Sequence, residues 1–101
     1  MNRELEFLDE ALEEAEEAAR WYAERSAVAA SGFAAELSDA IANIERAPNA
    51  WPIHEHNTRR FLLRRFPYSV VYRADAIRIV IVAVAYAHRR PGYWQDRLDP
   101  G

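Results

Sequence analysis

The stretch IRIVIVAVAYA, residues 77–87, decides the fold of this chain. Isoleucines at odd positions alternate with valines at even positions, so both faces of a strand formed here are apolar. A strand with two apolar faces is covered on both sides and belongs in the interior of a sheet. We therefore predict that residues 77–87 form the central strand.

Two more strands are predicted directly before it. Ala74 and Asp75 indicate a tight turn into the central strand, and residues 68–73 predict a second strand. Residues 60–66 predict a further strand, which only Pro67 separates from the second. The C-terminal half therefore contributes three consecutive strands to the predicted sheet.

The N-terminal segment predicts a short strand followed by a helix. Residues 4–8 alternate acidic and apolar side chains, which is typical of a strand with one inward face. Asp9 stands where an N-cap belongs, because its carboxylate can accept hydrogen bonds from the first helical turn. The helix is expected to run to about residue 25, with its glutamates, Glu14 included, on a solvated face. Its predicted apolar stripe is Leu8, Leu12, Ala15, Ala19 and Tyr22.

A second helix is predicted from the N-cap candidate Ser26 to about residue 46, before Pro48. The break between the helices is short, which indicates an antiparallel helical hairpin. The predicted fold is a two-layer α+β domain over residues 1–101, with the N-terminal strand and the helical hairpin packed on a small sheet. The apolar stripe of the second helix is predicted at Ala30, Phe33, Leu37, Ile41 and Ile44.

Charge is divided between the two halves of the chain. Residues 1–50 hold four arginines against twelve Asp and Glu, a net charge of −8, whereas residues 51–101 hold nine arginines against four, a net charge of +5. This division indicates an acidic helical face and a basic working face. There is no cysteine, which excludes disulfides, thiolate metal sites and a cysteine nucleophile. No signal peptide or membrane-spanning segment is recognisable, so we expect a cytoplasmic protein without membrane contact.

The segment HRRPGYW, residues 88–94, is the strongest candidate for a functional site. It places an imidazole, two guanidiniums and two aromatic rings directly after the central strand, where Pro91 and Gly92 turn the chain. Cations and aromatic faces together suit phosphate, a nucleobase or an acidic protein surface. His54 and His56 are two residues apart, but no further histidine or cysteine lies near them, so we expect no metal site.

Several stretches together resemble the RelE/ParE toxins of type II toxin–antitoxin systems, in the plasmid-stabilisation branch. They are RFPYSVVYR (65–73), IVIVAVA (79–85), HRRPGYW (88–94), the early Trp21-Tyr22 pair, and the loop with Pro48, Trp51 and Pro52. The resemblance covers nearly the whole chain and implies a helical hairpin on a strongly curved sheet. It also implies a growth-inhibiting toxin that a cognate antitoxin holds silent as a hetero-oligomer, without a cofactor.

The resemblance leaves two activities open, and with them the question of whether the chain is an enzyme. RelE-like members cut mRNA in the ribosome, whereas ParE-like members bind and poison DNA gyrase. Tyr93 aligns with the RelE-like tyrosine, but Ser69 stands where an arginine is expected, and Arg89 is displaced by two positions from another expected cation. A degenerate member that binds antitoxin without toxicity is the third possibility.

Cleavage of RNA would need a base, an acid and cations for the phosphorane charge. The candidate catalytic residues are His88, Arg89 and Tyr93, with His88 titrating near neutrality and Tyr93 needing a strongly lowered pKa to act as a base. Arg60 and Arg64 share one face of their predicted strand and suit carboxylates of an acidic antitoxin segment. The candidate residues for binding target or antitoxin are Arg60, Arg64, Arg73, Arg90 and Trp94.

Overall fold

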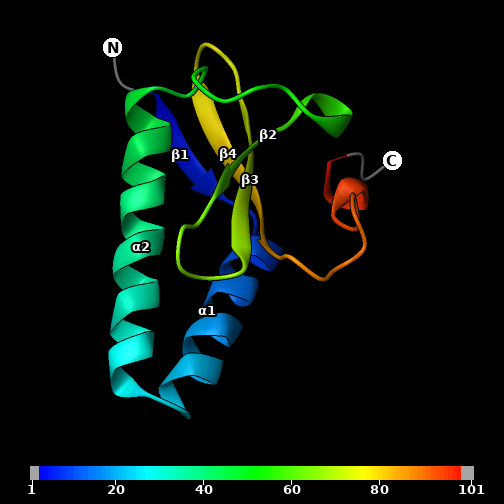
Figure 1. The fold of residues 1–101 in the computed structure, drawn as a ribbon. Helices are drawn as coiled ribbons and strands as arrows, with labels where there is room; N and C mark the ends of the chain where they lie inside the picture. The colour runs from blue at the N-terminus through cyan, green and yellow to red at the C-terminus, as the bar shows by residue number, and fades with distance from the viewer. Residues whose placement is uncertain (1–2, 99–101) are drawn as a thin grey trace.

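A mixed four-stranded sheet with strand order β1-β4-β3-β2 forms the centre of the computed structural model, which describes residues 3–98 (Figure 1). β4 lies between β1, to which it is parallel, and β3, to which it is antiparallel. The prediction of a central strand is therefore confirmed. The elements in chain order are β1 (Glu4–Phe7), α1 (Asp9–Ala23), α2 (Ala27–Arg46), the 3-10 turn η1 (Glu55–Asn57), β2 (Arg59–Leu62), β3 (Tyr68–Ala74), β4 (Arg78–Tyr86) and the 3-10 turn η2 (Gln95–Arg97).

The two faces of the sheet are covered by different parts of the chain. The helical hairpin packs on one face, and the C-terminal segment folds back over the other, so α2 and η2 lie on opposite sides of the strands in Figure 1. A β-bulge interrupts the alternation along β4: Val71 pairs with Ala83 and Tyr72 with Ile81, which leaves Val82 as the extra residue. Both faces of β4 are buried, as its sequence predicts, because the helical hairpin covers one and the C-terminal segment covers the other.

Helix α1 differs from its prediction in its cap and in its buried stripe. Leu8, not Asp9, occupies the N-cap position, and no side chain caps this end. Ala11 and Ala18 are fully buried, whereas Leu12 is 46% exposed. The stripe is displaced because α1 lies close to β4, where only a small side chain fits between helix and strand. The prediction of Asp9 as a cap and Leu12 as a core residue was wrong.

Helix α2 begins as predicted, with the Ser26 hydroxyl accepting a hydrogen bond from the Ala29 amide at 3.2 Å. Phe33 is its largest buried side chain and is 1% exposed. The Phe33 ring lies 5.4 Å from Tyr22, 5.5 Å from Phe66 and 5.3 Å from Tyr68, measured between ring centroids. This aromatic cluster joins both helices to the start of β3.

Strand β2 ends four residues before its predicted end. The Glu36 carboxylate of α2 accepts hydrogen bonds from the backbone amides of Arg64 and Arg65, the shortest at 2.9 Å. These bonds draw the chain after Leu62 out of the sheet and onto α2. No helix within residues 3–98 is both long and apolar enough to cross a membrane.

Candidate functional site

The segment that follows β4 is held by backbone hydrogen bonds and by one glycine. The Ala87 amide donates to the Pro67 carbonyl at 2.8 Å, and the Tyr93 amide donates to the Arg90 carbonyl at 3.1 Å. Gly92 has a φ of +73°, a conformation that side chains rarely adopt. Trp94 then packs on the outer face of the sheet and is 7% exposed. We call residues 87–98 the tail. Residues 99–101 lie outside the described residues.

Gly92→Ala is expected to destabilise the fold by about 1–2 kcal/mol, because a β-carbon opposes the left-handed backbone conformation. The new carbon would also stand 3.3 Å from a Glu55 carboxylate oxygen. A loss of 1 kcal/mol lowers the melting temperature by roughly 4–8 °C in a domain of this size. Thermal unfolding followed by circular dichroism measures the change.

Gly32→Ala is the matched control for that substitution. Gly32 lies inside α2, and its added carbon would meet the Phe66 ring at 3.4 Å, an ordinary contact distance. Alanine favours the helix over glycine, so stability should be unchanged or higher by up to about 1 kcal/mol. Equal destabilisation by both substitutions would contradict a special role for the Gly92 conformation.

The tail and β2 together enclose a hollow of about 120 Å³, which we call the arginine cavity. Arg60 reaches it from β2, while Arg89 and Arg90 reach it from the tail. Within residues 3–98 none of these three guanidiniums forms an ion pair. Glu55 also lines the cavity, so three positive charges stand against one negative charge, and this net cationic lining suits a carboxylate or a phosphate. Its other lining residues include His54, Ser69, Tyr86, Tyr93 and Trp94.

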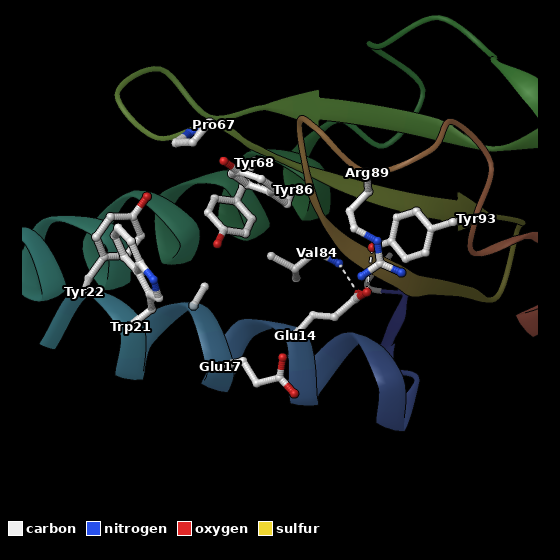
Figure 2. Close-up of a pocket in the computed structure, with 11 residues that line it drawn as sticks. Glu14, Glu17, Trp21, Tyr22, Pro67, Tyr68, Val84, Tyr86, Arg89 and Tyr93 are labelled. Atoms are coloured by element: carbon white, nitrogen blue, oxygen red, sulfur yellow. Dashed lines mark hydrogen bonds between the residues drawn. The ribbon is translucent and has the colours of Figure 1, made fainter. Parts of the chain in front are cut away.

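A second hollow, of about 390 Å³, runs between α1 and the end of β4, and we call it the aromatic groove (Figure 2). Trp21 and Tyr22 lie at one end of it, and Arg89 and Tyr93 lie at the other. Trp21 is 50% exposed, although the Arg25 guanidinium stacks on its ring, 3.7 Å from the centroid. Tyr86, Arg89 and Tyr93 line both hollows, so these three residues form the boundary that the arginine cavity and the aromatic groove share. The groove lies on the helix side of the sheet, beside Val84, whereas the cavity lies on the other side, beside Val71 and Ala85.

Tyr93 is the residue at the junction of the two hollows. The Arg89 guanidinium lies over its ring, 3.9 Å from the centroid, and its hydroxyl donates to the Glu14 carboxylate at 2.5 Å. Burial, together with the hydrogen bond to Glu14 and the charge of that carboxylate, raises the pKa of Tyr93. A general base needs a shift in the opposite direction. The guanidiniums beside Tyr93 do not reverse the effect of burial and of Glu14.

Glu14 is the residue of this region that the sequence interpretation missed. It was expected on a solvated face, but its carboxylate accepts hydrogen bonds from the Val84 amide at 3.0 Å and from Arg97 at 2.9 Å, in addition to Tyr93. Burial raises the pKa of Glu14, but the bonds from Arg97, Tyr93 and Val84 outweigh it, so that the pKa is lowered overall. No signal in the sequence distinguished it from the other glutamates of α1, because the predicted apolar stripe did not include Ala11, the buried residue one turn before it.

Three of the predicted site residues lie elsewhere. Arg64 borders a hollow on α2 beside Glu36, so it does not share a face with Arg60. The alternation that placed them together ends with β2 at Leu62. Arg73 borders a third hollow with Arg78, near the opposite end of β4, and donates to the His56 carbonyl. His88 lines neither the arginine cavity nor the aromatic groove. It is exposed, and its ring lies 5.1 Å from that of Tyr86.

Trp94 acts mainly as a packing residue of the cavity wall. Its ring and that of His56 are nearly perpendicular, with centroids 5.9 Å apart. It also packs with Val71 and Val82 on the face of the sheet opposite the helices. Within the described part of the chain, no three His, Cys, Asp or Glu side chains are grouped closely enough to hold a metal ion.

Comparison with known proteins agrees with this geometry. The solved structure described as "Chromosomal ParDE TA system from P. aeruginosa" matches with a TM-score of 0.75 at 17% sequence identity, covering 85% of this chain and 97% of that chain. The fold is therefore that of the RelE/ParE toxins, as predicted. A family model described as "ParE toxin of type II toxin-antitoxin system, parDE" matches residues 5–91. The chain belongs to this family of type II toxins. No curated protein matches the chain.

Proposed function

We propose that this chain is a growth-inhibiting toxin that a cognate antitoxin holds inactive, and that it acts by binding DNA gyrase. The observation that supports this most is that the arginine cavity and the aromatic groove adjoin at Arg89 and Tyr93. Two adjoining hollows, one lined by three arginines and the other by the half-exposed Trp21 ring, suit a polypeptide partner that contacts both.

Three features of the site favour binding over RNA cleavage. Tyr93 has a raised pKa, and its hydroxyl donates a hydrogen bond to Glu14. It therefore stays protonated and does not serve as a base near neutrality. His88 does not line the cavity whose arginines would hold a phosphate. Ser69 lines the cavity at the position where a RelE-like enzyme is expected to carry an arginine.

The antitoxin is proposed to cover the same cationic surface. The guanidiniums of Arg60, Arg89 and Arg90 suit the carboxylates of an extended acidic segment, each pair contributing charge-assisted hydrogen bonds. Such a segment orders when it binds, and its departure would expose the surface to gyrase. The complex is proposed to be a cytoplasmic hetero-oligomer of toxin and antitoxin, with a role in plasmid stabilisation.

Ribosome-dependent cleavage of mRNA is the second candidate, and one observation favours it. Three arginines, Arg60, Arg89 and Arg90, line a cavity of about 120 Å³, and a cluster of arginines also suits a phosphate. The two candidates therefore differ in what occupies the arginine cavity, a protein side chain or an RNA phosphate.

The deciding experiment adds the purified chain to DNA gyrase with supercoiled plasmid, and separately to translating ribosomes. Accumulation of cleaved gyrase–DNA complexes, with mRNA left intact, is expected. Codon-phased mRNA cuts with gyrase unaffected would replace this proposal by the second candidate. Normal growth of cells with confirmed expression, together with antitoxin binding, would identify a degenerate member.

His88→Ala is expected to leave toxicity within about twofold of the wild type, because surface side chains away from a site contribute little. Its imidazole is exposed and contacts the Tyr86 ring instead of the cavity. Growth of cultures under graded induction measures the effect. Arg89→Ala is the companion variant. We expect it to lower toxicity at least tenfold, since Arg89 lines both hollows. Loss of toxicity in His88→Ala alone would point to a chemical role for the imidazole.

A further inference from the structure

The edge of β4 changes its partner halfway along the strand. β1 pairs with β4 only as far as Phe7 and Ile81, and the Leu8 amide adds a last bond to the Ile81 carbonyl at 3.0 Å. Beyond that point the backbone of β4 is met by side chains. The Val84 amide donates to Glu14 at 3.0 Å, and the Val82 carbonyl accepts from Arg97 at 3.0 Å. Glu14 and Arg97 therefore take the place of a neighbouring strand.

These two residues also bind one another and bury their charges. Arg97 contacts both carboxylate oxygens of Glu14 at 2.9 Å, in a bidentate pair, and each side chain is 15% exposed. The Tyr93 hydroxyl completes the set, so that one carboxylate joins α1, β4 and the tail (Figure 2). Removing the carboxylate leaves the largely buried Arg97 guanidinium with only the Val82 carbonyl as acceptor and the partly buried Tyr93 hydroxyl without its acceptor, which is strongly unfavourable.

We propose that Glu14 is the positioning residue of the toxin surface, holding the tail so that Arg89 and Arg90 line the arginine cavity opposite Arg60. This inference rests on the proposed function of that surface in binding a protein. Glu14 fixes Tyr93, and Tyr93 carries the Arg89 guanidinium on its ring. Without the carboxylate the tail leaves the sheet edge, and the cations it carries no longer converge.

The test compares Glu14→Gln with Glu13→Gln. Glu13 is a neighbouring exposed glutamate on α1, so its substitution removes the same charge. Hydrogen exchange of the tail amides is the first measurement, because the amides of Tyr93, Gln95 and Arg97 are hydrogen-bonded within the tail. Glu14→Gln is expected to speed their exchange at least tenfold and to leave the amides of β3 unchanged. Glu13→Gln is expected to change neither.

Affinity is the second measurement. If the tail holds its binding shape only a tenth of the time, the dissociation constant for gyrase rises about tenfold. Glu14→Gln should show this rise and Glu13→Gln should not. Should Glu14→Gln fail to fold, Tyr93→Phe removes the hydroxyl contact alone and is expected to move both measurements in the same direction, to a smaller extent.

A pH profile separates positioning from general packing. The folded-state pKa of Glu14 is lowered, so its carboxylate stabilises the folded tail. This contribution to stability is fully present above the ordinary pKa of 4.5 and is lost as pH falls through the lowered value. The indole resonance of the buried Trp94 should therefore shift on acidification in the wild type and show no such step in Glu14→Gln. The charged and titratable groups that face Glu14 or its partner Arg97 are Arg97, Tyr93, Arg89, Glu10 and Glu17.

The outcomes separate this inference from the proposed function. Unchanged tail exchange in Glu14→Gln overturns the inference, and so does a loosened tail with gyrase affinity equal to the wild type. If the wild type binds its antitoxin but not gyrase, the proposed target is wrong. The same tenfold comparison made with the purified antitoxin then decides the role of Glu14.

Discussion

Reversing the charges of Arg60 and Arg89 together is expected to weaken binding of the antitoxin and of gyrase by at least about 100-fold. Arg60 lines the arginine cavity from β2, and Arg89 lines it from the tail. A hydrogen bond to a charged group contributes about 1.5–3 kcal/mol, and 1.4 kcal/mol corresponds to a factor of ten in affinity. Two glutamates at these positions add repulsion against an acidic partner. Calorimetric titration with the purified antitoxin measures the loss.

Arg20→Glu combined with Arg64→Glu is the control for that pair. Both guanidiniums are exposed, and neither lies in the arginine cavity, so the change in net charge is the same. We expect a loss of less than about threefold, from weakened long-range attraction alone. Equal losses in the two double variants would mean that overall charge, and not the cavity, attracts the partner.

Phe33→Ala is expected to lower the free energy of unfolding by about 3–5 kcal/mol, the usual cost of deleting a buried phenylalanine ring. Small domains are stable by only about 5–15 kcal/mol, so this variant should be largely unfolded at moderate denaturant concentration. Phe33 is 1% exposed, and its ring is in contact with rings from α1 and β3. Urea unfolding followed by tryptophan fluorescence gives the change.

Val28→Ala tests whether that effect arises from burial. Val28 lies on the same helix and is 83% exposed, so its replacement removes apolar atoms that already contact water. Stability is expected to stay within about 0.5 kcal/mol of the wild type. A large loss in this variant would show that the helix responds to any truncation.

The strands and the hairpin could be predicted because their signals are local. Residues 77–87 are apolar on both faces wherever they are placed, and Ser26 caps its helix through an amide three residues away. The buried face of α1 could not be predicted in the same way. Ala11 and Leu12 are both apolar, and only the close approach of β4 selects the smaller side chain for burial. The end of β2 depends on Glu36, which is 28 residues distant from Arg64 in sequence.

The candidate site divides in the same way. The arginines and aromatics of residues 88–94 are adjacent in sequence, so their gathering after the central strand was visible in advance. Their position in space is set by Glu14, which is separated from Tyr93 by 79 residues and from Arg97 by 83. No periodicity marks one glutamate among several on α1 as the acceptor. Contacts between residues so far apart in sequence can be identified only when the packing of α1 and the tail against β4 is known.

The bulge at Val82 has a consequence for how this chain can vary in length. Val82 and Ala83 are consecutive residues on the same layer, so the bulge resets the alternation of side chains for the rest of the strand. Deleting Val82 or Ala83 would remove the bulge and leave the later residues on their present faces, whereas deleting Val84 or Ala85 would exchange inside and outside from there on. The loop that joins α2 to β2 has no alternation of side chains to preserve. We therefore expect insertions and deletions among homologues to accumulate in this loop and to be rare in residues 84–86 at the end of β4.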